Sequence, residues 1–414
     1  MATVMDRSAL SPASHGRIGI FGAAIAFLIF YMIALPKGGI KVAGVPLTIG
    51  YAFTPILAIL AMARGHGLSI PVDRLLALVP PVGLALWSAF VVRINGAEST
   101  GALISYFVSV VYLPFFGLIA FSPLLLDDRR RLVERAFVWA VRFIVVYGIF
   151  LFVFKQATGR WIEIPYITVN VADVGQLDDK LIRRGTFFKL ISTYNNGNIF
   201  GVCVILMAPL YLLLEERRVL RGALYLALFL TLSRTAWIGM AMVFTMRSFS
   251  RGVRPSTILY LLVSSALAVF VLSFTVTAMG RDMSFLWDRN LGGRIAQLDV
   301  LSDMRIIPYK MFTSLPEIAY LGVIEFFGIP GFFLFVAYLA VVPVILWLEG
   351  VPPLSLSPAS ACQQGLLIYM VLACSDAAFG FIPVMMVFWM IAGLGLWYAH
   401  HQARLEGLVR ATSN

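Results

Sequence analysis

Residues 320–347 read YLGVIEFFGIPGFFLFVAYLAVVPVILW, and Glu325 is the only charged side chain among these 28 residues. The hydrocarbon core of a bilayer is about 30 Å thick, so a helix that crosses it needs about 20 predominantly apolar residues. The quoted stretch therefore predicts a transmembrane helix. The whole chain agrees, because 60% of its 414 residues are hydrophobic and 13% are charged, whereas about 25% are charged in soluble domains. We expect an all-α, polytopic membrane protein.

Apolar runs of similar length recur along the rest of the chain. We find no internal repeat and no soluble domain between them, so residues 1–414 are expected to form a single integral membrane domain. The first run has a basic flank but no clear cleavage site after it, which favours an uncleaved helix over a signal peptide. With this first run included, the runs cover residues 18–35, 46–63, 75–92, 102–123, 137–154, 198–214, 256–279, 362–376 and 381–399.

The apolar segment 222–246 is interrupted at its centre by Ser233-Arg234-Thr235. Basic clusters flank it on both sides, and the excess of Lys and Arg in cytoplasmic loops places both clusters inside. The chain between them must go out and return, with about 12 residues, or about 18 Å, in each limb. This is too short for a full crossing, so we expect a broken or re-entrant helix pair with Arg234 near its outer tip. The flanking clusters are Arg217, Arg218 and Arg221, and Arg247, Arg251 and Arg254.

Counting this hairpin as two passes predicts about twelve segments with both termini in the cytoplasm. The same count places two long loops, at about 156–197 and 280–319, on the outer face. Both loops mix aromatic and aliphatic residues with charges. Long loops are more often functional than passive connections, so we look for a site on the outer face.

The sequence also argues against several kinds of chemistry. The net charge is +11, but most basic residues lie in short loops between apolar runs, where membrane topology explains them better than nucleic-acid binding. We find no phosphate-binding loop, GxSxG elbow or HExxH motif, and all four histidines fall in segments expected to be cytoplasmic. The three cysteines lie in apolar runs without metal-ligand spacing. We therefore expect no metal, no cofactor and no nucleic-acid partner.

Four arginines are instead expected at the outer face. A guanidinium binds phosphate bidentately and stays charged near lipid, so converging arginines suit a lipid diphosphate. A charge at membrane depth costs at least about 2.5–3.5 kcal/mol, which makes such an arginine a functional candidate. The alternatives are a structural ion pair for the hairpin arginine and, for the others, surface solvation or pairing with Asp178, Asp179 or Asp299. The four are Arg183, Arg184, Arg234 and Arg294.

Asn195, Asn196 and Asn198 mark the start of the run at 198–214. Amide groups beside a helix N-terminus donate and accept hydrogen bonds, which suits sugar hydroxyls or phosphate. We therefore treat all three as candidate sugar-binding residues. Alternatively, Asn195 or Asn196 is simply the N-cap of the helix.

The order of these motifs resembles a known family. Arg-Arg-Gly-Thr precedes the asparagine-rich helix start, and Leu-Thr-Leu-Ser-Arg-Thr-Ala follows in the short helix pair. Gly-Gly-Arg then stands in the second outer loop, ahead of Glu-Phe-Phe-Gly-Ile-Pro-Gly. Over about residues 180–345 the chain is similar to the O-antigen polymerase and ligase superfamily, in particular to Wzy-type polymerases of polysaccharide repeat units. The first five expected helices match only in hydropathy.

The resemblance implies a glycosyltransferase of the bacterial inner membrane that works at its periplasmic face without a metal. A growing glycan would leave undecaprenyl diphosphate and pass to the end sugar of a new lipid-linked repeat unit. Arg234 and Arg294 match arginines that engage the diphosphate in the family, and Asn198 matches the asparagine at the helix start. The implied partners are undecaprenyl-diphosphate-linked oligosaccharides, membrane lipid, and the chain-length regulator and flippase of the same pathway.

Ligase members of the superfamily usually carry a His-Asn pair where this chain has Glu317-Ile318. The difference argues against a ligase and makes Glu317 a candidate general base, with Glu325 as the second candidate. Alternatively, Glu317 caps the helix that starts near Ile318. Three other functions stay open: an O-antigen ligase, a flippase and a structural scaffold. A flippase should show an internal repeat, and a scaffold leaves the cost of Arg234 unexplained.

Overall fold

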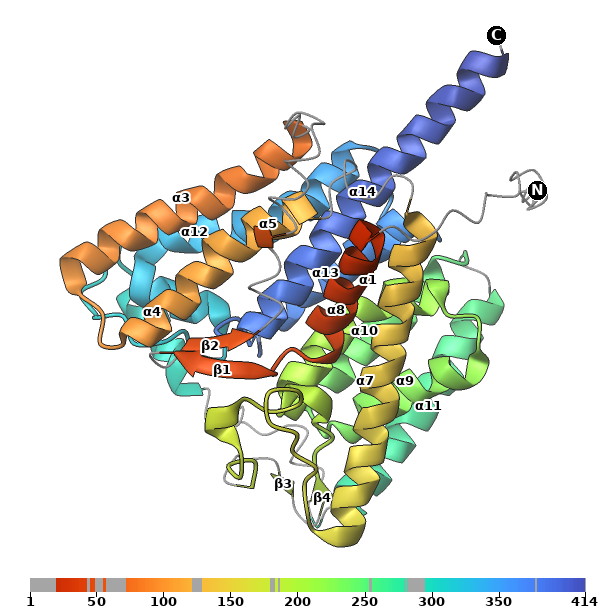
Figure 1. Ribbon diagram of the computed structural model, residues 1–414, viewed down its shortest axis with the longest axis horizontal. Helices are drawn as coiled ribbons and strands as arrows, with labels where there is room; N and C mark the ends of the chain where they lie inside the picture. The colour runs from red at the N-terminus through yellow and green to blue at the C-terminus, as the bar shows by residue number, and fades with distance from the viewer. Residues whose placement is uncertain are drawn as a thin grey trace.

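The computed structural model describes residues 20–42, 45–48, 55–56, 72–120, 129–178, 183–184, 187–252, 255–278, 280, 295–376 and 378–413. These residues form a bundle of twelve α-helices (Figure 1). The helices are α1 (Ile20–Ala34), α3 (Val72–Asn95), α4 (Thr100–Phe107), α5 (Leu113–Ala120), α7 (Arg130–Thr158), α8 (Gly197–Leu214), α9 (Arg218–Leu230), α10 (Arg234–Phe249), α11 (Pro255–Ala278), α12 (Ala319–Leu348), α13 (Pro358–Leu372) and α14 (Ile382–Ser413).

Seven helical units among the described residues are long and apolar enough to cross a membrane. They are α3, the continuous unit of α4 and α5, α7, α8, α11, α12 and α14. A π-helical turn at Val108–Tyr112 joins α4 to α5. The expectation of a mostly helical, membrane-type bundle is therefore confirmed. The twelve-segment topology and the periplasmic placement of the loops stay predictions.

Four short strands form two antiparallel hairpins: β1 (Gly39–Val42) with β2 (Val45–Thr48), and β3 (Arg183–Arg184) with β4 (Phe187–Phe188). The prediction of a helix from residue 46 is wrong at its start, because residues 46–48 belong to β2. Pro46 opposes Lys41 in this hairpin, and the edge of a two-stranded ribbon is a position that tolerates proline. Beyond β2, only residues 55–56 of the predicted run 46–63 lie within the described residues.

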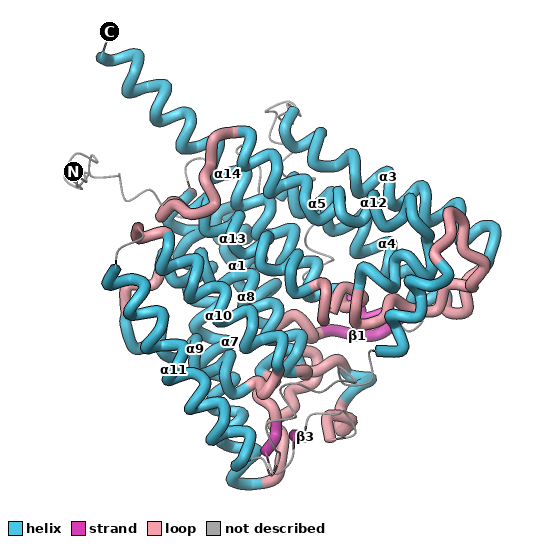
Figure 2. Tube along the Cα trace, turned by 180° about the vertical axis from the view of Figure 1, so that it is seen from behind, coloured by secondary structure: helices cyan, strands magenta, loops and turns pink. Residues whose placement is uncertain are grey.

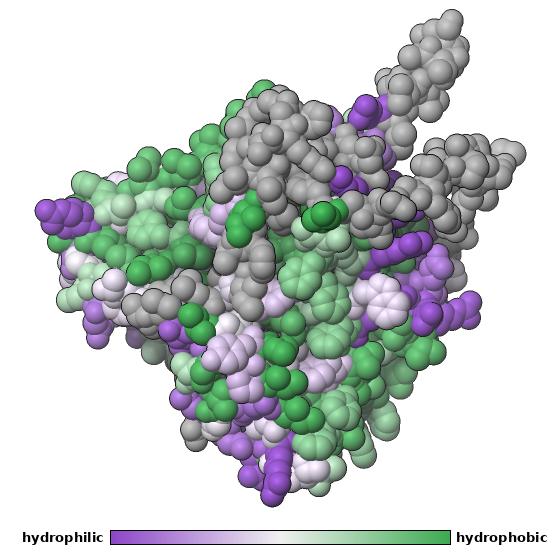
Figure 3. All heavy atoms as spheres, viewed as in Figure 1, coloured by the Kyte–Doolittle hydropathy of each residue, from purple (hydrophilic) through white to green (hydrophobic). Residues whose placement is uncertain are grey.

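The centre of the bundle is α8, which is almost entirely buried because α7, α10, α13 and α14 pack around it. The first part of α14 is equally enclosed. At the periphery, α11 packs on α10 and leaves most of its large apolar side chains exposed. Figure 3 shows apolar side chains over much of the visible surface, with hydrophilic ones gathered toward the lower tip and at the upper right. A helix with an apolar outer face suits lipid better than water.

The strands and several connections gather at one end of the bundle (Figure 2). Short contacts join them: Gly39 bridges Asn170, and the amide of Leu190 donates to the carbonyl of Leu230 at 2.9 Å. Nearby, the Lys37 ammonium lies 5.4 Å from the centre of the Phe381 ring. We call this end the loop face. It comprises β1–β2, β3–β4, residues 159–178 and 187–196, the α9–α10 turn, and the segments 304–318 and 373–381, of which residue 377 is not described.

The predicted break in the segment 222–246 is confirmed. The first limb, α9, has 13 residues and ends at Leu230, and α10 has 16 residues and begins at Arg234. In the turn between them, Leu232 adopts a positive φ of 50°. This value lies outside both the right-handed helical region and the β region of backbone conformations. The chain therefore forms two separate helices here, with Arg234 at the tip.

The run 320–347, expected as one uninterrupted helix, is instead kinked at Gly328, which has φ 70° and ψ −169°. The amide of Ile329 donates to the carbonyl of Arg305 at 2.9 Å rather than continuing the helical ladder. A Cβ at Gly328 would collide with the carbonyl oxygens of Arg305 and Ile306. Only glycine tolerates both the backbone conformation and this close approach, and the kink therefore fixes the segment 304–318 against α12.

Candidate functional site

The N-terminal ends of α8 and α10 lie side by side at the loop face. Asn196 is the N-cap of α8, and its side-chain oxygen accepts from the amides of Asn198 at 2.8 Å and Ile199 at 3.3 Å. Close packing holds the two helix starts together, since a Cβ at Gly201 would lie 2.8 Å from the Cβ of Ala236. The alternative that one asparagine caps this helix is therefore confirmed for Asn196.

A cluster of polar side chains occupies this meeting point. The amide of Asn198 donates to Oδ2 of Asp376 at 2.8 Å, and Nζ of Lys189 approaches Oδ1 of Asn198 at 3.5 Å. Beside them, the hydroxyls of Thr235 and Ser375 are 3.4 Å apart. Arg234 is the first residue of α10, next to Thr235 in the sequence. We call these residues the polar junction: Lys189, Asn198, Arg234, Thr235, Ser375 and Asp376. It joins the starts of α8 and α10 to the connection between α13 and α14.

The electrostatics of the polar junction favour a negatively charged ligand. Two helices of 18 and 16 residues begin here, and the N-terminal end of a helix carries a partial positive charge. Lys189 and Arg234 add two full positive charges, whereas Asp376 adds one negative charge. Lys189 and Asp376 are buried, with 5% and 4% of their surfaces exposed, and Arg234 is half-buried. Charges in such a low-dielectric position act more strongly than charges in water.

The predicted residues Arg183 and Arg184 form β3, which pairs with β4. The Arg183 guanidinium lies 5.8 Å from the centre of the Phe188 ring and is exposed. Phe187 packs against Leu232 and Trp237 at the turn that precedes Arg234. The strand pair thus places the backbone of Arg184, which is paired with Phe187, on the strand next to the one that contacts the α9–α10 turn. The diphosphate role of Arg183 and Arg184 stays a prediction. The fourth predicted arginine, Arg294, lies outside the described residues.

Asp178, considered as a partner for these arginines, pairs with Lys155 instead. Their Nζ–Oδ1 distance is 2.6 Å, and the same oxygen accepts from the Trp161 indole at 2.9 Å. The Lys155 ammonium also lies 4.7 Å from the centre of the Phe188 ring. This network anchors the connection after α7 to β4 and uses Asp178 for that purpose.

Asn195 differs from its two neighbours. It is buried and has a positive φ of 57°, and its amide donates to the carbonyl of Thr168 at 3.0 Å. Asparagine tolerates this left-handed conformation better than most residues. The side chain therefore holds the connection between α7 and α8 in place, and of the three candidate asparagines Asn198 is the one in the polar junction.

The two candidate bases lie at the start of α12. Glu325 forms a 2.6 Å ion pair with Lys310 of the segment 304–318, and this contact raises the pKa of Lys310 above its ordinary value. Glu317 is exposed and precedes the helix by two residues. The alternative that Glu317 caps the helix is wrong, because Ile318 occupies the N-cap position.

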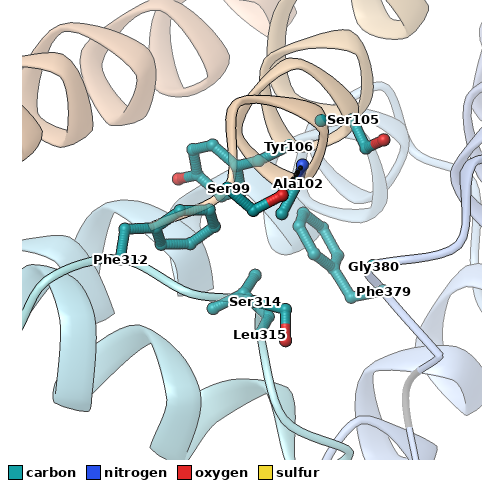
Figure 4. A pocket seen from close by; sticks show the side chains of 10 residues that line it. Ser99, Ala102, Ser105, Tyr106, Phe312, Ser314, Leu315, Phe379 and Gly380 are labelled. Carbon is teal, nitrogen blue, oxygen red and sulfur yellow. Dashed lines mark hydrogen bonds between the residues drawn. The ribbon is translucent and has the colours of Figure 1, made fainter. Parts of the chain in front are cut away.

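A cavity of about 270 Å³ opens at the loop face beside this segment. Figure 4 shows that its walls come from α4, from the segment around Phe312 and from the turn at Phe379. A bridge between Ala97 and Phe312 holds the first two walls together. Sequence reasoning did not anticipate this cavity, since its walls are small or aromatic residues from three distant segments. Its lining is Ser99, Gly101, Ala102, Ser105, Tyr106, Phe312, Ser314, Leu315, Phe379 and Gly380.

Sequence reasoning also missed Lys189 and Asp376. A signal was present for Asp376, which is the only acidic residue between Glu349 and Glu406 and lies at the end of the predicted run 362–376. Lys189 had no comparable signal, because it is one of several cations in a long loop. In the described residues no group of three or more His, Cys, Asp or Glu side chains could hold a metal ion.

Comparison with known proteins gives no assignment. The chain matches no protein-family model and no curated protein sequence.

Proposed function

We propose that this protein polymerises lipid-linked oligosaccharide repeat units at the outer face of a bacterial inner membrane. The observation that carries the proposal is the polar junction, where Lys189, Asn198 and Asp376 lie at the start of α8 and Arg234 begins the neighbouring helix α10. Such a group suits the diphosphate of a lipid carrier, which bears negative charge before and after transfer. The family resemblance of residues 180–345 supports the same substrate.

The reaction would be a single displacement at the anomeric carbon of the growing chain. The acceptor hydroxyl oxygen forms the new bond to this carbon, while the bond from carbon to the diphosphate oxygen breaks. The electron pair leaves with the diphosphate, and the hydroxyl proton passes to a carboxylate. Cations at the polar junction stabilise the charge that develops on the leaving group. Glu317 is the proposed base, because it stands where ligase members of the resembled superfamily carry histidine and lies exposed just before α12.

The two long connections fit this scheme because both belong to the loop face. The connection after α7 supplies Lys189 and the β3 arginines, and the segment before α12 supplies Glu317. One end of the bundle thus holds the cations proposed for the leaving group and the carboxylate proposed for the acceptor. A flippase would need no such division between a phosphate site and a base.

The test is deletion of the gene followed by a size profile of the lipid-linked glycans. Accumulation of single repeat units on the carrier lipid, restored to long chains by the wild-type gene, is the expected result. Full-length chains that stay on the carrier lipid would assign the protein as a ligase instead. Absence of repeat units from the outer face would assign it as a flippase.

A further inference from the structure

We infer that the 270 Å³ cavity between α4, Phe312 and Phe379 binds a neutral sugar ring of the acceptor repeat unit. This inference rests on the proposed function and names the place of one substrate. The cavity is a site separate from the polar junction, and none of the described residues that line it is among the candidate catalytic or phosphate-binding side chains.

The lining excludes the charged and the lipid parts of the substrate. Among the described residues, the lining contains no Lys, Arg, His, Asp or Glu, so none of these side chains would neutralise a phosphate. It does contain the hydroxyl-bearing residues Ser99, Ser105 and Ser314, which an isoprenoid chain could not use. A neutral ligand with many hydroxyls fits this lining best, because each serine hydroxyl both donates and accepts hydrogen bonds.

The aromatic residues of the cavity supply an apolar surface, which sugar binding needs in addition to hydroxyl groups. Phe312 and Phe379 belong to a buried ring cluster around Tyr106, with centroid distances of 5.5 and 6.4 Å to that ring. The Tyr106 hydroxyl is itself satisfied by Ser88 at 2.7 Å. The cluster therefore offers a rigid apolar floor, against which the C–H face of a sugar ring would pack, and the serines line the same cavity (Figure 4).

The size and position of the cavity further limit which part of the substrate it can bind. Sites for drug-sized molecules range from about 300 to 1,000 Å³, so a cavity of about 270 Å³ suits a single ring rather than an oligosaccharide. Ser99, Ser314 and Gly380 at its rim are exposed, which leaves room for the rest of the chain outside. Ser314 and Leu315 lie just before Glu317, the proposed base. Since the base takes its proton from the acceptor, the cavity is assigned to the acceptor.

The same helix offers a matched control. Its other side, at Ile104, faces an apolar groove of about 490 Å³ that Leu103, Phe107 and Val111 also line. Ile104 is exposed at 41%. Ala102→Trp would fill the cavity, whereas Ile104→Trp adds bulk to the same helix on the other side. Ser314→Ala removes one hydroxyl from the opposite wall without adding bulk.

The probe is the repeat-unit oligosaccharide, released by mild acid from the lipid carrier that accumulates in the deletion strain. Its binding to the full-length protein in detergent is measured by saturation-transfer NMR. We expect Ala102→Trp to weaken binding at least 10-fold and Ile104→Trp to leave it unchanged. Ser314→Ala should weaken it about 2- to 10-fold, as the loss of one neutral hydrogen bond predicts.

Wild-type affinity in Ala102→Trp, or no binding by the wild-type protein, would overturn the assignment. If both tryptophan variants weaken binding equally, Ser314→Ala decides, and unchanged affinity in that variant also overturns it. These results are separable from the proposed function. Failure of the deletion strain to accumulate repeat units contradicts polymerisation itself, whereas accumulation with unaltered binding by the cavity variants contradicts only the sugar site.

Discussion

At the scale of single residues, Arg234 carries the sharpest prediction. Lys keeps the positive charge but lacks the planar fork that binds two phosphate oxygens at once. Arg234→Lys should therefore slow chain growth about 10- to 150-fold, the value of one charge-assisted contact of about 1.5–3 kcal/mol expressed in the transition state. The measurement is polymer formation from purified lipid-linked repeat units at matched protein levels.

Arg251→Lys is the control for this experiment, because Arg251 is exposed just beyond the other end of α10. It should polymerise at the wild-type rate. Full activity in Arg234→Lys would remove the bidentate phosphate contact from the proposal.

The proton acceptor is tested at the same scale. Glu317→Gln should leave folding and substrate binding intact but slow chain growth about 10²- to 10⁴-fold, the usual effect of losing a general base. Glu317 is exposed and does not occupy the N-cap position, so the change should cost little stability. Single-turnover growth rates measure the effect.

Glu325→Gln is the companion variant, because it weakens the ion pair with Lys310 without touching Glu317. We expect it to lower the unfolding temperature more than the rate. Wild-type growth in Glu317→Gln together with slow growth in Glu325→Gln would transfer the role of base to Glu325.

At the scale of elements, a buried ion pair ties α7 to the end of α8. Nε and Nη2 of Arg142 donate to the two carboxylate oxygens of Glu215 at 2.6 and 2.8 Å, and Tyr211 donates to the same group at 3.0 Å. Removing one partner of such a pair typically costs about 3–5 kcal/mol. Glu215→Gln should therefore lower the unfolding temperature strongly, and Glu216→Gln, at the exposed neighbouring position, should not.

The same pair predicts a pH dependence. Hydrogen bonds from Arg142 lower the pKa of Glu215 to about 2, whereas an unfolded glutamate titrates near about 4.3. A lowered native pKa means that the stabilisation is fully present above the unfolded value and is lost as the pH falls from about 4.3 toward 2. In thermal unfolding the wild-type protein should lose stability over this interval, and Glu215→Gln should lose less. Equal losses in both proteins would contradict this role for the pair.

The kink in α12 is tested by two glycines with similar positive φ angles, 70° at Gly328 and 81° at Gly350. Gly350→Ala places a side chain at φ 81° in open space, at a cost of about 1–2 kcal/mol. Gly328→Ala adds a collision with the carbonyls of Arg305 and Ile306, which raises the cost by about 1–3 kcal/mol more. Unfolding of both variants in detergent measures the difference. Equal losses of unfolding free energy in the two variants would mean that the contact between the segment 304–318 and the kink does not contribute to stability.

At the scale of the whole molecule, the prediction concerns the side of the membrane on which the loop face lies. In a Cys374→Ser background, an impermeant thiol reagent added outside intact spheroplasts should modify cysteines placed at Gln176 and Met311, both of which are exposed. Cysteines at Arg131 and Arg251, on the opposite end of the bundle, should react only after permeabilisation. Outside labelling at Arg251 would contradict the assignment of the loop face to the periplasm.

The sequence by itself determined the helical membrane class, most of the apolar helices and the break before Arg234. Each of these follows from local patterns: runs of about 20 apolar residues, and a polar triplet that contains one arginine where an apolar run is too short to cross twice. The strand at residues 46–48 and the kink at Gly328 were missed because contacts with β1 and with Arg305 override local apolarity.

Only the tertiary structure decided which polar residues meet. Lys189, Asn198 and Asp376 are separated by up to 187 positions, and they converge because α8, α10 and α13 pack around one another. Apolar periodicity indicates which residues face away from water or toward lipid. It does not indicate which helices pack against each other. The pairing of helices depends on close contacts such as that between the backbone of Gly201 and the side chain of Ala236. Such contacts exist only once the helices are assembled.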